Sequence, residues 1–415
     1  MKKIAFVIPS LFGGGAERAA SIIANELGKD FYVCLITLEE GKSYELIEKI
    51  KYIQLTKLYC KANKLIKLLY FPIQLFKLKN ILNKIVPDII ISFTERPSFM
   101  LHLLKQKKNI YSFHNYMSFH LYSEKLLFPI KILRNYFYKK FLKDLYKTSA
   151  YTVIMSKEAM LDLKNHFNVR SKIEVFYYPF EIKKIKNMCD EKSIYDFLFE
   201  KGKVLINIGR LEKQKGQWHL LRIFSELRKN RDTKLVILGD GSLRNYLLNL
   251  SRSLNLKTYS IWSDEKLNLE YDVYFLGFQK NPFRLIKLST MFVLASLWEG
   301  FPNILVEALA CLKTVITTDC HSGPRELLAP GSNPLQKTEG AEFSEYGILM
   351  PNLTTGFVNF NTPLSDVEKL WIKTLEGTVN NNIILEKYEK LAFNRALDFN
   401  VDKIMPQWHA LIDKV

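Results

Sequence analysis

Short runs of β-branched and aromatic residues alternate with helix-like segments along most of the chain. This alternation is typical of parallel βαβ units, in which a helix returns the chain to the start of the next strand. The strands predicted in the first half are Ile4–Ile8, Tyr32–Thr37, Ile89–Phe93, Asn109–Phe113 and Tyr151–Met155. Those predicted in the second half are Val204–Gly209, Lys234–Leu238, Val273–Leu276, Met291–Ala295 and Thr314–Thr317. Two stretches, 258–271 and 330–346, interrupt the alternation and are interpreted as loops. The sequence therefore predicts an α/β protein with two doubly wound halves.

The length of the chain indicates two domains. A domain usually holds about 100–200 residues, so 415 residues are expected to form two. We predict an N-terminal domain over 1–180 and a C-terminal domain over 195–395, with the crossing near Pro179–Phe199. The tail at 396–415 is predicted to be helical and could pack back on the first domain.

Five cysteines are scattered along the chain without a Cys-x-x-Cys pair. This pattern favours neither a disulfide framework nor a structural zinc site, and it fits a reducing, cytoplasmic setting. No run of about 18 apolar residues occurs, so a membrane-spanning helix is not expected. The apolar start, Met1–Ile8, is too short for the core of a signal peptide and is interpreted as the first buried strand.

The charge of the chain is basic and uneven. Lysine and arginine number 60 against 42 aspartates and glutamates, and residues 51–150 hold 19 basic against 4 acidic residues. There Lys57–Lys84 and Lys125–Lys147 interleave lysines with large apolar residues, as basic amphipathic helices on anionic membrane surfaces do. Ordinary surface helices are the alternative. Arginine supplies only 13 of the 60 basic residues and no nucleic-acid-binding module is recognised, so nucleic acid is not an expected partner.

Three glycines follow the first predicted strand and lead directly into a predicted helix. Gly13, Gly14 and Gly15 would let a ligand approach the backbone, and the N-terminus of the helix offers free N–H groups to an anion. A diphosphate fits both features. The alternative is a tight strand-to-helix turn without a ligand.

A second pattern suited to anions follows the first strand of the C-terminal half. Arg210 comes after Gly209 at the end of this strand, and Lys215 precedes Gly216 at the start of a helix. Two cations beside the carboxyl end of a strand can hold a diphosphate. Solvated surface charges are the alternative.

The most specific pattern places two carboxylates eight residues apart. Glu299 lies in the turn after a predicted strand, and Glu307 lies about two turns into the next helix. Between them, Gly300–Asn303 shape the start of the helix, whose first N–H groups have no partner within it. Carboxylates are good acceptors for the paired hydroxyls of a sugar or a ribose. A helix-capping Glu299 with a solvated Glu307 would not explain the Gly-Phe-Pro-Asn sequence between them.

Together these patterns resemble the retaining glycosyltransferases of family 4. The resemblance rests on the early Gly-Gly-Ala-Glu-Arg sequence, the Gly-Arg and Lys-Gly pairs of Gly209–Gly216, and the spacing of Glu299 and Glu307, which occur in the family's order. It covers nearly the whole chain, weakly over 40–150 and more strongly over 200–330. It implies the GT-B fold, in which two Rossmann-like, doubly wound parallel-sheet domains face a central cleft.

The resemblance also implies roles for the matching residues. Arg210 and Lys215 would neutralise the donor diphosphate and stabilise the departing nucleotide. Glu299 would contact the transferred sugar, and Glu307 would hold the ribose hydroxyls. His114 matches the histidine that the family places near the sugar, although a buried structural histidine is the alternative. The further binding residues implied are Gly14, Gly15, Gly300, Phe301, Pro302, Asn303 and Glu326.

Two segments qualify the resemblance. Many relatives have Asn-Pro at the domain crossing, whereas this chain has Tyr178-Pro179, which leaves open any polar contact there. The segment Ser322–Leu328 is similar to the branch of the family that builds bacterial surface and lipid-linked glycans, including N-acetylgalactosaminyltransferases. The alternative is that Ser322 caps a helix and that Arg325 and Glu326 form a surface pair.

The chain contains no Asp-x-Asp sequence. Glycosyltransferases that hold the diphosphate through a divalent metal need such clustered carboxylates. Positive side chains and helix N-termini can supply the charge here, so we predict transfer without a metal. The resemblance implies a front-face reaction in which the leaving phosphate helps to deprotonate the acceptor and no side chain is the nucleophile.

We therefore predict a retaining glycosyltransferase that moves an N-acetylhexosamine or a hexose from a UDP-sugar to a lipid-linked or surface-polysaccharide acceptor. It would work in the cytoplasm, on the inner face of the plasma membrane. One alternative is a GT-B nucleotide-sugar epimerase, which would need more acid and base residues than His114 and Glu299. Another is a basic membrane- or nucleic-acid-binding module with a degenerate active site, against which the intact Arg210, Lys215 and Glu307 argue.

Overall fold

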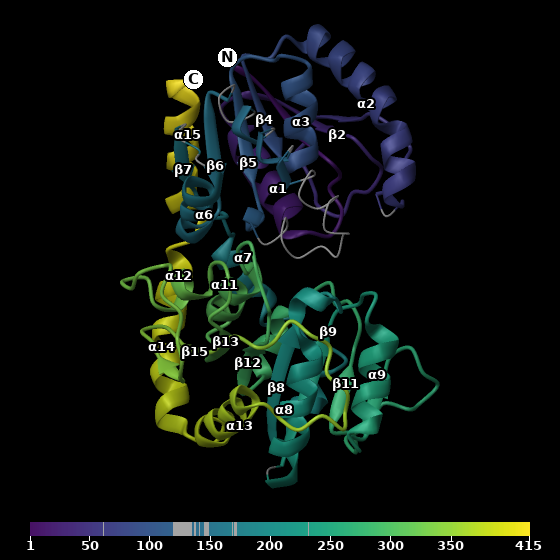
Figure 1. Cartoon of the computed structure of the whole chain (residues 1–415), viewed down its shortest axis with the longest axis vertical. Coiled ribbons are helices and arrows are strands. Elements are labelled where there is room, and N and C mark those ends of the chain that lie inside the picture. Colours follow the sequence, from purple (N-terminus) through teal and green to yellow (C-terminus); the bar gives the residue numbers. More distant parts are fainter. Residues whose placement is uncertain are drawn as a thin grey trace. The chain divides into compact units, whose positions relative to one another are not determined.

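The computed structural model describes residues 1–415 except 61, 119–134, 137, 141, 145–148, 168, 170, 171 and 231. The chain forms two compact units (Figure 1). Unit 1 comprises Met1–Phe180 and Asn400–Val415, and unit 2 comprises Glu181–Phe399. No helix among the described residues is long and apolar enough to cross a membrane.

Unit 1 contains a seven-stranded parallel sheet with the order β3-β2-β1-β4-β5-β6-β7. Its strands are β1 (Lys3–Ile8), β2 (Tyr32–Thr37), β3 (Lys51–Gln54), β4 (Ile89–Phe93), β5 (Asn109–Phe113), β6 (Tyr151–Ile154) and β7 (Ile173–Val175). Its described helices are α1 (Gly15–Leu27), α2 (Lys64–Ile85), α3 (Glu95–Leu103), α6 (Lys157–Phe167) and α15 (Val401–Lys414). Every residue of β4 and β5 is buried, so both faces of the sheet are covered.

Unit 2 contains an eight-stranded sheet with the order β10-β11-β9-β8-β12-β13-β15-β14, in which only the β14–β15 pair is antiparallel. Its strands are β8 (Lys203–Ile208), β9 (Thr233–Leu238), β10 (Thr258–Ser260), β11 (Val273–Phe275), β12 (Met291–Leu294), β13 (Val315–Thr318), β14 (Glu342–Phe343) and β15 (Ile348–Met350). Its described helices are α7 (Ile182–Met188), α8 (Gln217–Asn230), α9 (Arg244–Ser253), α10 (Phe283–Leu288), α11 (Asn303–Ala310), α12 (Pro324–Leu328), α13 (Asp366–Thr378) and α14 (Asn382–Leu397), with 3₁₀ turns at Asp196–Phe199 and Lys213–Lys215.

The structure confirms the predicted α/β class and the two doubly wound parallel sheets. Each predicted strand is present: three have the predicted ends, and the others have ends that differ by one residue. The second basic segment of the sequence, Lys125–Lys147, lies for the most part outside the described residues. The loop predictions for 258–271 and 330–346 are wrong in part, because β10 occupies 258–260 and β14 occupies 342–343. These strands have three and two residues, which is too short for a periodic pattern.

The last helix of the chain, α15, belongs to unit 1. Trp408 is 1% exposed and packs edge-on against the ring of Phe176, with ring centroids 5.4 Å apart. The backbone N–H of Val401 donates to the carbonyl of Phe180 at 2.9 Å, and Nζ of Lys2 donates to the carbonyl of Ile412 at 2.8 Å. Figure 1 shows α15 in yellow beside the strands of unit 1. Unit 1 is therefore built from residues at both ends of the chain.

Candidate active site

The strand order of unit 2 predicts where its sheet would bind a ligand. In open α/β sheets, ligands bind at the carboxyl ends of the strands where the strand order reverses. In unit 2 the order reverses between β8 and β12, which are neighbours in the sheet. Gly209 and Arg210 follow β8, and the turn that carries Glu299 follows β12. Two of the predicted motifs therefore meet at this edge.

Lys215 and Glu299 form an ion pair at this edge. Nζ of Lys215 donates to Oε1 of Glu299 at 2.6 Å, and the two side chains are 13% and 5% exposed. The hydroxyl of Ser296 donates to the same oxygen at 2.6 Å, and Nε2 of Gln214 donates to Oε2 at 3.2 Å. Three side-chain donors from two loops thus hold the Glu299 carboxylate, and Lys215 balances its charge.

Two glycines allow the loop of Lys215 to approach this closely. A Cβ on Gly209 would lie 3.2 Å from Cγ and Cδ of Lys215, whose aliphatic part lies against the end of β8. Gly216 has a φ of +59°, and a Cβ there would come within 2.3 Å of the carbonyl oxygen of Ala295. A side chain at Gly216 would therefore move the backbone that places Lys215 opposite Glu299.

Arg210 is an exposed cation at this edge. Its Nη2 donates to Oε1 of Gln214 at 3.4 Å, and among the described residues it has no carboxylate partner. Lys215, by contrast, is paired with Glu299. The two predicted cations therefore differ, because the charge of Arg210 remains available to an anion and that of Lys215 is already balanced.

The entry of α11 carries the next group of predicted residues. Pro302 is the N-cap and supplies no side-chain cap, and Glu307 is 8% exposed in the second turn. Oδ1 of Asn303 is buried and has no hydrogen-bond partner among the described residues. Buried polar atoms are nearly always paired, so Oδ1 of Asn303 can receive a polar ligand. The backbone N–H groups of Asn303 and Leu305 already donate to the carbonyls of Phe301 and Pro302.

Ser322 fastens the turn before α11. Its hydroxyl donates to the carbonyl of Gly300 at 2.6 Å, and its backbone N–H donates to the carbonyl of Glu299 at 3.0 Å. The N-cap of α12 is Gly323, with a φ of +101°. The interpretation of Ser322 as a helix cap is therefore wrong, because its side chain supports the Glu299 turn.

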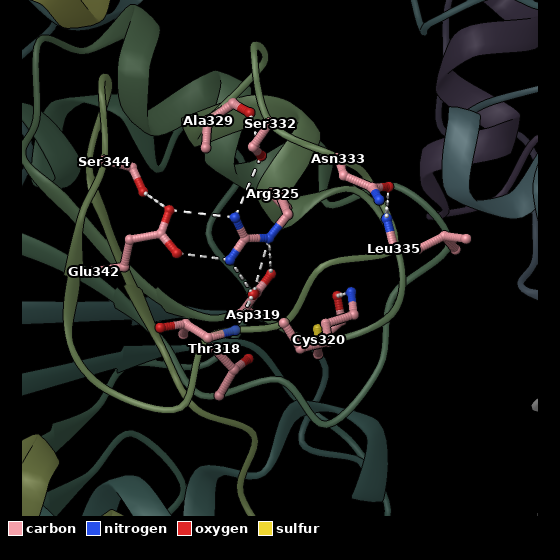
Figure 2. Close-up of polar contacts among 12 residues, drawn as sticks. Thr318, Asp319, Cys320, Arg325, Ala329, Ser332, Asn333, Leu335, Glu342 and Ser344 are labelled. Carbon is pink, nitrogen blue, oxygen red and sulfur yellow. Dashed lines mark hydrogen bonds and ion pairs between the residues drawn. The ribbon is translucent and has the colours of Figure 1, made fainter.

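The interpretation of Arg325 and Glu326 as a surface pair is also wrong. Arg325 is 1% exposed, and its guanidinium lies between Asp319 and Glu342 (Figure 2). Nε donates to Oδ2 of Asp319 at 3.0 Å, and Nη2 donates to Oε2 of Glu342 at 2.8 Å. Because Asp319 follows β13 and Glu342 belongs to β14, this network fixes the 329–344 loop and α12, which carries Glu326 at 6% exposure.

In unit 1 the corresponding edge lies at the ends of β1 and β4, where that sheet reverses. Gly13 has a φ of +70°, Gly14 is the N-cap of α1, and Gly15 is its first residue. The carboxylate of Glu17 folds over this N-terminus, since a Cβ on Gly14 would lie 1.9 Å from its Oε2. A carboxylate therefore stands where a diphosphate was predicted, and the flexible Glu17 side chain would have to move to admit one.

His114 follows β5, and its ring lies nearly parallel to two neighbouring aromatic rings. The ring centroids of Phe93 and Tyr178 lie 5.2 and 5.5 Å from that of His114, and Nδ1 lies 2.5 Å from the hydroxyl of Tyr178. Burial lowers the pKa of His114 to about 3, so its imidazole is neutral at neutral pH. Nε2 is buried without a hydrogen-bond partner among the described residues. His114 can thus form a hydrogen bond to a ligand but carries no charge.

Three residues of these sites were missed by the sequence analysis. Gln214 and Ser296 hold Glu299, and Tyr178 supplies the polar contact that was left open at the domain crossing. The available signal was weak: Gln214 lies between the two predicted cations, and Ser296 lies three residues before Glu299. Among the described residues no group of three or more His, Cys, Asp or Glu side chains could hold a metal ion.

Comparison with known families and structures identifies the class of protein to which this chain is similar. Residues 13–183 match the family described as Glycosyltransferase Family 4, and residues 191–337 match the family described as Glycosyl transferases group 1. The structure of HepE from Anabaena in complex with UDP aligns with a TM-score of 0.68 at 16% identity, over 100% of both chains. The fold is that of the GT-B glycosyltransferases.

Two sequence relatives define the family more closely. An uncharacterised glycosyltransferase of Methanocaldococcus jannaschii is 32% identical over 349 residues, which are 81% of this chain and 82% of the relative. The N-acetylgalactosamine-N,N'-diacetylbacillosaminyl-diphospho-undecaprenol 4-alpha-N-acetylgalactosaminyltransferase of Campylobacter jejuni is 31% identical over 334 residues, which are 79% and 83% of the two chains. The chain belongs to the glycosyltransferases with family 4 and group 1 domains.

Proposed function

We propose that this protein is a retaining glycosyltransferase that moves an N-acetylhexosamine or a hexose from a UDP-sugar to a lipid-linked or surface-polysaccharide saccharide. The observation that carries the proposal is the edge of unit 2 where Arg210, free of a carboxylate partner among the described residues, lies in the same loop as Lys215, which pairs with Glu299. The UDP bound to HepE supports the donor, and the diphospho-undecaprenol in the name of the Campylobacter relative supports the acceptor. Such an enzyme would work at the inner face of the plasma membrane.

The proposed roles follow from the charges at the site. Negative charge accumulates on the UDP as the glycosidic bond breaks, and Arg210 would stabilise it. Glu299, oriented by Lys215, would accept hydrogen bonds from the sugar, and Glu307 from the ribose. From unit 1 the family resemblance adds Gly14 and Gly15 for the diphosphate and the neutral His114 for a sugar hydroxyl. Binding contacts are further assigned to Gly300, Phe301, Pro302, Asn303 and Glu326.

Retention of configuration fits the state of Glu299. A carboxylate that accepts three hydrogen bonds, one of them from a lysine, is stabilised as an anion and is a weak nucleophile. We therefore propose the front-face route, in which a phosphate oxygen of the leaving UDP takes the proton of the acceptor hydroxyl. The same cations would make a metal unnecessary.

The test is a panel of UDP- and GDP-sugars with an acceptor saccharide linked to a polyprenyl diphosphate. We expect UDP and one UDP-sugar to raise the melting temperature of the purified protein. We also expect transfer that persists in EDTA, with the anomeric configuration retained in the NMR spectrum of the product. Release of an epimeric sugar from the UDP-sugar alone would favour an epimerase. Neither stabilisation nor turnover with any donor would overturn the proposal.

A further inference from the structure

Two cysteines of unit 2 lie side by side although they are far apart in the sequence. Sγ of Cys189 and Sγ of Cys311 are 3.3 Å apart, and the two residues are separated by 122 positions. Cys189 is the C-cap of α7, and Cys311 is the C-cap of α11. The two helices lie against each other in unit 2 (Figure 1). The fold thus brings together two thiols that their spacing in the sequence gives no reason to pair.

Hydrogen bonds hold the backbone of both cysteines. The N–H of Cys189 donates to the carbonyl of Ile185 at 3.1 Å, and the carbonyl of Cys189 accepts from Nη1 of Arg284 at 3.4 Å. The N–H of Cys311 donates to the carbonyl of Glu307 at 3.0 Å. The S–S bond of a disulfide is about 2.05 Å long, so the two sulfur atoms need to approach by little more than about 1 Å. A bond between them therefore requires little movement of either helix.

The surroundings of the pair favour loss of the proton from Cys189. The hydrogen bond with Cys311 lowers the pKa of the Cys189 thiol, and the charge of Lys287 lowers it further, while burial opposes both. Burial raises the pKa of the Cys311 thiol. Because the thiolate is the reactive form of cysteine, Cys189 is the attacking thiol of the pair and Cys311 is the resolving thiol.

Both cysteines are buried but lie next to the surface of unit 2. Cys189 is 2% exposed and precedes the exposed Asp190, and Cys311 is 1% exposed and precedes Leu312, which is 36% exposed. α7 has only seven residues, and the end of a short helix opens more readily than a core element does. A small oxidant such as hydrogen peroxide can therefore reach the pair.

We propose that Cys189 and Cys311 form a redox modification site, which a peroxide closes to a disulfide and a dithiol opens again. The thiolate of Cys189 attacks one oxygen of hydrogen peroxide, the O–O bond breaks, and hydroxide leaves and takes up the proton that Cys189 released. The sulfenic acid that remains on Cys189 is then attacked by Sγ of Cys311, and its oxygen leaves as water with the proton of Cys311. In sum, two thiols and one peroxide give one disulfide and two waters.

The disulfide would join α7 to the helix that carries Glu307. Cys311 lies one turn after Glu307, and the bond would close a loop that spans 122 positions. Cross-links over long loops restrict the unfolded chain most, so the oxidised protein should be more stable than the reduced one. The inference does not rest on the proposed function, because cross-linking and stability are measured without a sugar donor.

The experiment is oxidation of the folded, full-length protein with hydrogen peroxide, followed by alkylation of free thiols and peptide mass spectrometry. The test variant is Cys189→Ala, and the matched control is Cys60→Ser in unit 1, which leaves the pair intact. In the parent and the control we expect a peptide cross-linked through Cys189 and Cys311. Oxidation should also raise the melting temperature of both by about 5 °C or more. Dithiothreitol should reverse both effects, and neither should occur in Cys189→Ala.

Free thiols at both positions in the oxidised parent would overturn the proposal, as would a sulfinic acid at either one without a cross-link. A cross-link that joins Cys189 or Cys311 to another cysteine would overturn it as well. Cys311→Ala is the second test variant, in which dimedone should trap a sulfenic acid at Cys189 after oxidation. Trapping of a sulfenic acid at Cys311 in Cys189→Ala, with none at Cys189 in Cys311→Ala, would overturn the order of attack.

Discussion

At the scale of single residues, the Lys215–Glu299 pair gives two neighbouring cations different tasks. Lys215 is mostly buried and balances a carboxylate, whereas Arg210 is exposed and makes one long hydrogen bond to Gln214. Removing Lys215 leaves a buried charge with one partner fewer. Removing Arg210 leaves the fold nearly untouched. Substitution of Lys215 should therefore lower both stability and activity, whereas substitution of Arg210 should lower activity and leave stability nearly unchanged.

We predict that Lys215→Ala and Arg210→Ala each lower transfer by about 100-fold or more, because Arg210 would stabilise the charge on the leaving UDP and Lys215 holds Glu299 in place for the sugar. Lys215→Ala should also lower the free energy of unfolding by about 1–3 kcal/mol, since the Glu299 carboxylate loses its charged partner. Arg210→Ala should change stability by less than about 0.5 kcal/mol. Denaturant unfolding and initial transfer rates measure the two effects.

Glu307→Ala is the companion variant for the same site. It should abolish transfer while the protein stays folded, because the proposal assigns Glu307 to the ribose hydroxyls. Full activity in Glu307→Ala or in Lys215→Ala would refute the assignment of the site.

His114 gives a prediction on pH. The pKa is about 3 in the folded protein and 6.5 in an exposed histidine, so protons favour the unfolded chain between these values. The contribution of His114 to stability is therefore complete above pH 6.5 and is lost as the pH falls toward 3. Between pH 7.5 and pH 5 the parent protein should lose about 2 kcal/mol more than His114→Phe.

The measurement is the free energy of unfolding of both proteins at the two pH values. The histidine NMR signals supply the control, because the His114 ring should not titrate between pH 8 and pH 5. A signal from His114 that titrates near pH 6.5 would contradict the neutral, buried state.

At the scale of elements, the turns before the helices of unit 2 depend on close backbone approach. We predict that Gly216→Ala destabilises the protein by about 1–3 kcal/mol, because the new Cβ would strike the carbonyl of Ala295 in a backbone conformation with positive φ. Gly331→Ala is the matched control, since no heavy atom lies within 4 Å of its Cβ position. Thermal unfolding of both variants checks this, and equal melting temperatures would show that the turn can relax.

The ion pairs of Arg325 with Asp319 and Glu342 are a second contact that links separate elements of unit 2. Arg325→Met should cost about 3–5 kcal/mol, because it leaves the buried carboxylate of Asp319 without its cation. It should also expose the 329–344 loop to limited proteolysis, since Glu342 loses the same partner. In the control, Lys369→Met, the lost pair with Asp366 is exposed and should matter by less than about 0.5 kcal/mol. An uncleaved loop in Arg325→Met would show that other contacts hold it.

At the scale of the whole molecule, each unit has its own buried tryptophan. Trp408 of α15 lies in unit 1 and Trp371 of α13 lies in unit 2, and they are 1% and 0% exposed. We predict that Trp408→Ala lowers hydrogen-exchange protection in unit 1 and that Trp371→Ala lowers it in unit 2, each at a cost of about 3–5 kcal/mol. Equal losses in both units from one substitution would show that they unfold together.

The central strands and the motifs beside them could be predicted from the sequence. Ile89–Phe93 is an apolar run because β4 is covered on both faces, and burial of this kind leaves a local pattern. The edge strand β3 was not predicted, because its four residues are partly exposed and show no such pattern. Glu299 was predicted from its spacing to Glu307, whereas Ser296 was missed because nothing near it in the sequence marks it as a partner of Glu299.

Residues close together in the chain were therefore enough to establish the α/β class, the glycine turns and the position of each motif after its strand, because these depend on local backbone and burial periodicity. Which charges are paired was decided by the folded molecule alone. Lys215 meets Glu299, Arg325 meets Asp319 and Glu342, and α2 turns an apolar face outward, because sheet order and packing bring together segments that are distant in the chain. Pairing and burial of this kind depend on remote partners, and no local pattern records them.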